Sequence, residues 1–242
     1  MTGKGLSRMQ RDNLARFGLI ALATDLTIEG DAARLLPANC RLHVTRIAFE
    51  NPTTRENLLR IGPHLRAAAD LLVPGVGLRG IGFGCTSAAA VLGQGVEAAI
   101  GDRAPVSTPG GAALRGFRAL GVGRIALMTP YLPRTADLVG DYFQAQGLRV
   151  VRRHSMGHAD DREMAMLSPD EVVDFALESD HPEAEALFIS CTALPAVPVI
   201  ERIEARLGKP VVSSNLALFW AMLDIAAIPA SGPGRLFGVR TW

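Results

Sequence analysis

The sequence predicts an α/β protein built from two pseudo-symmetric, flavodoxin-like halves, each with a parallel sheet, and an active site between them. Two observations lead to this prediction. Expected strands and helices alternate along the chain, and the strands are continuous apolar runs, as in parallel sheets covered on both faces. A chain of 242 residues also carries one strand-and-turn pattern twice, which suits two halves with separate cores.

The repeat is clearest around two cysteines, which lie 106 residues apart. Cys85 and Cys191 each follow an apolar run, and each is followed by a threonine. Two further matches at nearly the same offset pair residues 19–24 with 124–129 and residues 106–108 with 212–214. Because each cysteine ends an expected strand, the repeat predicts two thiols at equivalent points of the two halves.

Hydrophobic periodicity gives the remaining elements in order. In the first half we expect strands at 18–23, 42–49, 78–84 and 105–106, and helices at 55–72 and 88–100. Thr53 or Thr54 would be the N-cap of the first helix. In the second half we expect strands at 125–128, 148–152, 186–189 and 211–212, and helices at 135–146, 169–177 and 197–207.

The last predicted helix, at 216–227, is expected to cross back onto the first half, because the chain after it is too short to form a domain. The expected division is therefore residues 1–106 plus 217–242 for the half with Cys85, and residues 107–216 for the half with Cys191.

Composition narrows the classes of function. Hydrophobic residues make up 48% and charged residues 20%, as in a globular protein, and a net charge of +1 without charge runs argues against nucleic-acid binding. No apolar run is long enough to span a membrane, and residues 1–13 do not form a signal peptide. Three cysteines without such a signal predict free thiols in the cytoplasm.

Both cysteines are expected where ligands bind in open α/β sheets, beyond the carboxyl ends of the strands. A following helix would lower a thiol pKa, because helix N-termini stabilise the thiolate. Thr86, Ser87 and Thr192 add hydroxyl donors. One thiolate could remove a proton, or attack a carbon, on one face while the other thiol donates on the opposite face. Cys40 has no counterpart in the repeat and is interpreted as a packing residue.

No cofactor is expected. The glycine-rich segment 80–84 lacks the GxGxxG pattern of dinucleotide-binding loops. Neither of the two lysines lies in a context typical of pyridoxal phosphate, and the five histidines do not have metal-ligand spacing.

Several motifs resemble the aspartate/glutamate racemase superfamily, in the branch that contains maleate cis-trans isomerases, arylmalonate decarboxylases and ectoine-utilisation proteins of the EutA type. The motifs are Gly84-Cys85-Thr86-Ser87, Thr129-Pro130-Tyr131 and Cys191-Thr192. Segments 22–25, 51–57 and 160–163 look most like the ectoine-utilisation members. The resemblance covers essentially the whole chain and implies a cofactor-independent enzyme, expected to be a homodimer.

The resemblance also implies roles for individual residues. Cys85 would be the nucleophile and Cys191 the proton donor or acceptor. Thr86, Ser87 and Tyr131 would hold a substrate carboxylate, with Thr192 beside the second thiol. The decarboxylases have glycine at the position of Cys85, so a chain with both thiols is expected to be an isomerase or racemase that acts on a small carboxylate substrate.

Two aspartates depart from the maleate isomerases, which have asparagine where this chain has Asp25 and Asp161. An ionised carboxylate only accepts hydrogen bonds and would repel a second substrate carboxylate. A substrate with a cationic or N–H-rich end, such as ectoine or a diaminobutyrate derivative, is therefore expected. Three alternatives remain open: both aspartates as structural caps or loop residues, a decarboxylase or other lyase, and a non-catalytic small-molecule-binding protein.

Overall fold

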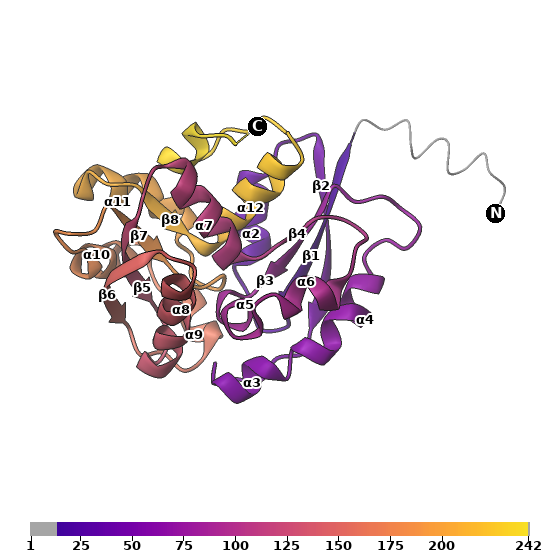
Figure 1. The fold of residues 1–242 in the computed structure, drawn as a ribbon, viewed down its shortest axis with the longest axis horizontal. Helices are drawn as coiled ribbons and strands as arrows, with labels where there is room; N and C mark the ends of the chain where they lie inside the picture. Colours follow the sequence, from indigo (N-terminus) through magenta and orange to yellow (C-terminus); the bar gives the residue numbers. More distant parts are fainter. Residues whose placement is uncertain (1–13, 242) are drawn as a thin grey trace.

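The protein was analysed as a computed structural model, which describes residues 14–241. The N-terminal segment, residues 1–13, interpreted above as lacking a signal peptide, and Trp242 lie outside the described residues. Two four-stranded parallel sheets form the framework, and helices flank both of them (Figure 1). This architecture confirms the predicted fold class.

The two sheets have equivalent strand orders, β2-β1-β3-β4 and β6-β5-β7-β8. The strands of the first sheet are β1 (Ala15–Leu22), β2 (Cys40–Ile47), β3 (Gly80–Gly84) and β4 (Val106–Ser107). Those of the second are β5 (Arg124–Thr129), β6 (Arg149–Ser155), β7 (Ala186–Ile189) and β8 (Val211–Ser213). Each cysteine of the repeat therefore follows an inner strand, β3 or β7, and the topology reproduces the internal symmetry of the sequence.

Helices of the first half are more broken than predicted. They are α2 (Ile28–Leu35), α3 (Arg55–Leu59), η1 (Gly62–His64), α4 (Leu65–Asp70), α5 (Thr86–Leu92) and α6 (Gly95–Ile100). The single helix expected at 55–72 is interrupted at Gly62-Pro63, because proline lacks the N–H that a continuous helix needs. Gly93, with φ of +56°, likewise divides the helix expected at 88–100. The N-cap of α3 is Thr54, whose side chain accepts from the Asn57 N–H.

Helices of the second half include two that were not predicted, α7 and α9. They are α7 (Pro109–Ala119), α8 (Pro133–Ala145), α9 (Asp161–Ala165), α10 (Pro169–Ser179), η2 (Val197–Val199) and α11 (Ile200–Leu207), and after β8 the chain continues with α12 (Ser214–Ile225) and η3 (Arg235–Gly238). Helix α7 contains three glycines, which lowers its intrinsic propensity. Packing compensates, because Phe117 is buried and Gly110 lies directly against the Tyr142 ring.

Helix α12 contacts both halves of the molecule. Its first eleven residues are buried, and it packs against α7, α2 and β3. The close approach of α12 and α2 to β3 depends on glycines in this strand. A Cβ at Gly82 would lie 2.9 Å from the sulfur of Met222 on α12, and one at Gly84 would lie 2.5 Å from Ile28 Cδ1 on α2. The glycine-rich segment therefore serves helix–sheet packing.

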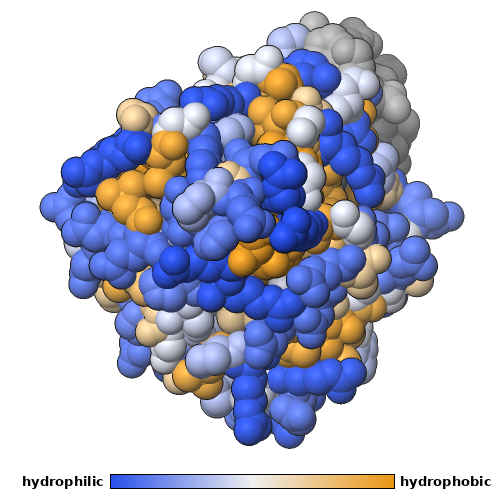
Figure 2. Space-filling view, turned by 60° about the vertical axis from the view of Figure 1, so that its left-hand side comes forward, coloured by the Kyte–Doolittle hydropathy of each residue, from blue (hydrophilic) through white to orange (hydrophobic). Residues whose placement is uncertain are grey.

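The larger apolar core does not stop at the boundary between the halves. It combines Phe17 and Leu19 of β1 with residues of the second sheet and with α12, whereas a smaller core fills the other face of the first sheet. On the face shown in Figure 2, hydrophilic residues cover most of the surface and apolar residues form separate patches. Among residues 14–241, no helix is long and apolar enough to cross a membrane.

Candidate active site

The two repeated cysteines lie at the carboxyl ends of equivalent inner strands. Cys85 follows β3 and is the N-cap of α5, where its sulfur accepts from the Ala88 N–H at 3.4 Å. Cys191 lies two residues beyond β7, in a turn that precedes η2. The helix expected directly after each thiol is thus present only at Cys85.

Two hydrogen-bond bridges join the backbone around Cys85 to the backbone around Cys191. Thr192 Oγ1 donates to the Gly84 carbonyl at 3.2 Å. On the other side, Thr86 Oγ1 donates to Ser214 Oγ at 2.7 Å, and the same oxygen accepts from the Cys191 N–H at 3.0 Å. The flanking residues of both cysteines are therefore fastened to one another, and the cysteines are held at one interface as free thiols.

Both thiols are buried, and burial decides their ionisation. It raises the pKa of Cys85 to about 11, although the Ala88 N–H and the Ser87 hydroxyl act in the opposite direction. Burial also raises the pKa of Cys191, and the nearby charge of Asp25 raises it further. The prediction that helix N-termini lower these pKa values is therefore wrong, because desolvation outweighs the amide donors.

Hydroxyl groups surround the thiols. Ser87 Oγ lies 3.7 Å from the Cys85 sulfur. Ser190 Oγ donates to Tyr131 Oη at 3.3 Å, which leaves the phenolic proton available to another acceptor. Tyr131 is 2% exposed, and burial beside Cys191 raises its pKa, so the phenol stays a donor. These groups can bind a carboxylate without a cationic side chain.

Asp25 presents one free carboxylate oxygen at this interface. Its Oδ1 accepts from the N–H groups of Thr27 and Ile28, at 2.8 and 2.9 Å, where α2 begins. Its Oδ2 is buried and has no hydrogen-bond partner among the described residues. Burial raises the pKa of Asp25, while the two amides and the nearby Thr192 hydroxyl lower it. The Asp25 charge in turn raises the pKa of both thiols, which places it near both of them.

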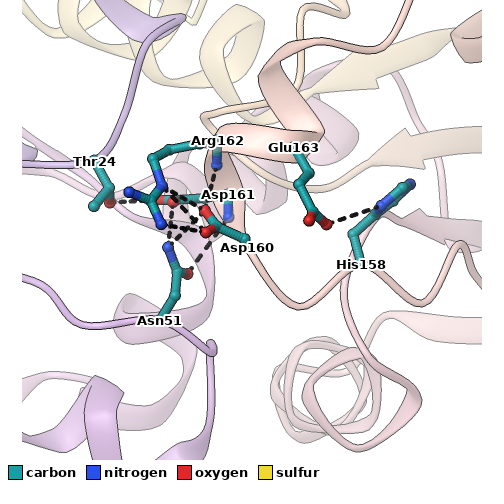
Figure 3. Close-up of polar contacts among 7 residues, drawn as sticks. All are labelled: Thr24, Asn51, His158, Asp160, Asp161, Arg162 and Glu163. Carbon is teal, nitrogen blue, oxygen red and sulfur yellow. Dashed lines mark hydrogen bonds and ion pairs between the residues drawn. The ribbon is translucent and has the colours of Figure 1, made fainter.

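Asp161 has no free oxygen. Thr24 Oγ1 donates to its Oδ2 at 2.5 Å, and Asn51 Nδ2 donates to its Oδ1 at 2.7 Å (Figure 3). Asn51 Nδ2 also lies 2.9 Å from Asp160 Oδ1, and Asp160 pairs with Arg162. These contacts fasten loops after β1 and β2 to the start of α9, so Asp161 closes the junction between the halves.

The site is enclosed. Every residue named as catalytic or substrate-binding is at most 6% exposed: Asp25, Cys85, Thr86, Ser87, Tyr131, Asp161, Cys191 and Thr192. Open surface grooves lie elsewhere, for example the groove of about 500 Å³ lined by Leu36 and Pro229, and we give them no catalytic role. Within residues 14–241, no three His, Cys, Asp or Glu side chains are grouped as metal ligands would be.

Ser214 and Asn215 are site residues that sequence reasoning did not select. A signal for the first was present, because Ser214 belongs to the repeated segment 212–214. Asn215 Nδ2 donates to the Thr192 carbonyl at 2.8 Å, and its Oδ1 is another buried atom without a partner among the described residues. Buried unpaired polar atoms are rare in folded proteins, so their presence beside the thiols supports a functional site.

Fold and site together define a class of pseudo-symmetric, two-sheet α/β proteins with one thiol from each half at a shared interface. The family model for arylmalonate decarboxylase matches residues 87–237. The chain belongs to this family, which contains decarboxylases and related isomerases.

Similar proteins include members with either activity. Maleate isomerase from Nocardia farcinica is 29% identical over 237 residues, which cover 91% of this chain and 94% of the relative. Arylmalonate decarboxylase from Bordetella bronchiseptica is 33% identical over 138 residues, which cover 55% and 58% of the two chains. A solved structure of a cysteine-to-serine variant of the N. farcinica isomerase, with a covalently bound succinylcysteine intermediate, aligns with a TM-score of 0.85 and 26% identity. The alignment covers 93% of this chain and 98% of that one.

Proposed function

We propose that the protein is a cofactor-independent isomerase or racemase that uses Cys85 and Cys191 at a carbon next to a carboxylate. The observation that carries the proposal is the pair of bridges that fastens the two cysteine segments together in one buried site. A decarboxylase that uses Cys191 alone would not need the Cys85 thiol that these bridges hold in the same site. The succinylcysteine in the related isomerase supports covalent chemistry at one cysteine.

For a cis-trans isomerisation, the Cys85 thiolate would add to the double bond and form a C–S bond. The displaced electron pair would move to the neighbouring carbon, which takes a proton from the Cys191 thiol. After rotation about the resulting single bond, the Cys191 thiolate would recover that proton while the C–S bond breaks. In a racemisation, one thiolate would remove the α-proton while the other thiol delivers a proton to the opposite face.

Asp25 would link substrate binding to activation of the thiols. Its charge raises the pKa of Cys191 and of Cys85. A substrate ammonium or amidinium group placed against Asp25 Oδ2 would neutralise that charge and so make thiolate formation easier. The thiols would become reactive only when such a substrate is bound.

The substrate class follows from the same oxygen. A second carboxylate about 4 Å from ionised Asp25 would cost roughly 4 kcal/mol at an effective dielectric of 20, or about a thousandfold in affinity. We therefore propose a monocarboxylate with a cationic end, in the manner of an ectoine or diaminobutyrate derivative. Such a substrate has no carbon–carbon double bond beside its carboxylate, so racemisation is the reaction proposed for it. An EutA-type role in ectoine utilisation is the corresponding physiological proposal.

The test is a substrate panel assayed by NMR in D₂O, with ectoine and 2,4-diaminobutyrate derivatives, maleate and phenylmalonate. We expect deuterium incorporation or isomer exchange with the cationic monocarboxylates and little turnover of maleate. Cys85→Ser and Cys191→Ser should each lower the rate by at least about 10³-fold, since removing the activated nucleophile or proton donor has such effects. Cys40→Ser is the matched control and should retain the rate.

Efficient maleate turnover by the unmodified protein would overturn the substrate class and leave the two-thiol mechanism standing. Unchanged activity in both active-site cysteine variants would overturn the mechanism itself.

Decarboxylation is the second candidate, favoured by the family model and the 33% identical decarboxylase. It predicts CO₂ release from phenylmalonate that depends on Cys191 and persists in Cys85→Ala. The two-thiol proposal predicts no such release.

A further inference from the structure

The backbone at Cys191 has an unusual conformation. Its φ is +99°, a region that residues with a side chain rarely adopt and that usually occurs where the surrounding structure enforces it. Such strain clusters at functional sites, which makes the groups that hold this turn worth identifying.

Two neighbouring residues at the start of α12 hold the turn from one side. Ser214 Oγ accepts from the Cys191 N–H, and Asn215 Nδ2 donates to the carbonyl of Thr192 at 2.8 Å. The Thr192 side chain is in turn bonded to Gly84. The Cys191 N–H and the Thr192 carbonyl, at the two ends of this dipeptide, are therefore both bonded to residues of α12.

Asp31, on α2, orients the asparagine. The amide of Asn215 also donates to Asp31 Oδ2, at 2.8 Å, so one side-chain nitrogen spans Asp31 and Thr192. An ionised carboxylate can only accept hydrogen bonds, and so it forces Asn215 to present nitrogen rather than oxygen. The Asn215 oxygen consequently has no partner among the described residues.

The buried position of Asp31 disfavours its ionised form. Asp31 is 3% exposed, and burial raises its pKa to about 6. The hydrogen bond from Asn215 and the charge of Arg34 lower this pKa, whereas the charge of Asp25 raises it. The segment 214–221 of α12, which includes the Asp31 partner Asn215, supplies no charged residue to compensate. A buried carboxylate kept at this cost beside a reactive site points to function rather than packing.

We propose that Asp31 and Asn215 are positioning residues that hold the Cys191–Thr192 turn, and with it the Cys191 thiol, in its strained conformation. The Asp31 carboxylate acts on Asn215, and Asn215 acts on the turn. Neither residue reacts with substrate. The inference concerns the thiol of the proposed function, but its test does not depend on turnover.

The experiment measures how fast each cysteine of the full chain reacts with iodoacetamide at pH 7.5, by mass spectrometry of peptides. Asn215→Ala and Asp31→Leu should release the turn and raise the labelling rate of Cys191 by about tenfold relative to that of Cys85, the factor that corresponds to 1.4 kcal/mol of lost restraint. Asp31→Asn should give an intermediate rate, because an amide still offers an acceptor but no longer fixes the orientation of Asn215.

Asp224→Asn is the matched control. Asp224 is a buried acid on α12, the helix that carries Asn215, but its carboxylate is bonded to Arg115 and Thr241. This substitution should leave the ratio of Cys191 to Cys85 labelling unchanged, and Cys40 reports global unfolding in every variant. An unchanged ratio in Asn215→Ala and Asp31→Leu would overturn the proposal. So would an equal acceleration of all three cysteines, which would indicate general destabilisation.

Discussion

The chemistry of individual residues in this site is governed by the removal of water. Cys85 receives a backbone N–H at the start of α5, the arrangement that lowers thiol pKa values in exposed sites, yet its pKa is raised to about 11. Burial raises the pKa values of Cys191 and Asp25 as well. Under the proposed function, a cationic group of the substrate would offset the Asp25 charge and so favour the thiolate.

Asp31 gives a prediction for stability. Its carboxyl has a pKa of about 6 in the folded protein and an ordinary value of 3.8 when exposed, so folding disfavours its ionised form. The resulting loss of stability should begin as pH rises above about 4 and be complete above about 6. By linkage the loss is roughly 3 kcal/mol at most.

Asp31→Asn removes this ionisation and should therefore be more stable than the unmodified protein at pH 7.5, with the difference disappearing near pH 4. Urea unfolding at the two pH values measures it. Asp224→Asn should behave in the opposite way, because Thr241 and Arg115 lower the pKa of Asp224 despite its burial. Equal effects of the two substitutions at both pH values would show that ionisation of Asp31 is not the cause.

At the scale of elements, loops that follow the strands of the first half are hydrogen-bonded to helices of the second half. Asn51, in the loop before α3, donates to Asp160 and Asp161 at the start of α9. A second hydrogen bond joins the halves nearby, because Thr135 Oγ1 of α8 donates to the Thr53 carbonyl at 2.6 Å. A short segment of the first half is thus attached to two helices of the second half.

Asn51→Asp should loosen this junction, because it replaces a donor with a third carboxylate next to Asp160 and Asp161. Repulsion of about 1.4 kcal/mol or more would raise the labelling rates of both Cys85 and Cys191 about tenfold relative to Cys40. Asn57→Asp is the control, since it adds the same charge to α3 beside Arg60. Labelling rates that match those of the control would show that the Asn51 contacts do not close the site.

At the scale of the whole molecule, α12 makes the two halves one packing unit. Apolar residues of this helix, including Leu218 and Phe219, belong to the core that also contains residues of β1 and of the second sheet. Contacts of this kind favour cooperative unfolding over separate unfolding of each half.

The chain should therefore unfold in a single thermal transition, with calorimetric and van't Hoff enthalpies in agreement. Leu218→Ala, which removes buried contacts at the centre of α12, should lower stability by about 2 to 5 kcal/mol and keep one transition. Two resolved transitions, in either protein, would show that the halves fold independently.

The sequence by itself determined the features that depend on local pattern and internal repetition. Apolar runs and β-branched residues located all eight strands, and the repeat placed Cys85 and Cys191 at equivalent strand ends. Helices α2, α7 and α9 were missed because two are short and α7 is rich in glycine.

Only the tertiary structure decided what those residues meet. It gave Asp161 partners on both oxygens, left Asp25 with one free oxygen and placed Asn215 between Asp31 and the Cys191 turn. The contacts of Asp161 with Thr24 and Asn51, and that of Asn215 with Asp31, join residues more than a hundred positions apart, which no local pattern encodes. The direction of each pKa shift was decided at the same level, because desolvation depends on everything that surrounds a group and not on its neighbours in the chain.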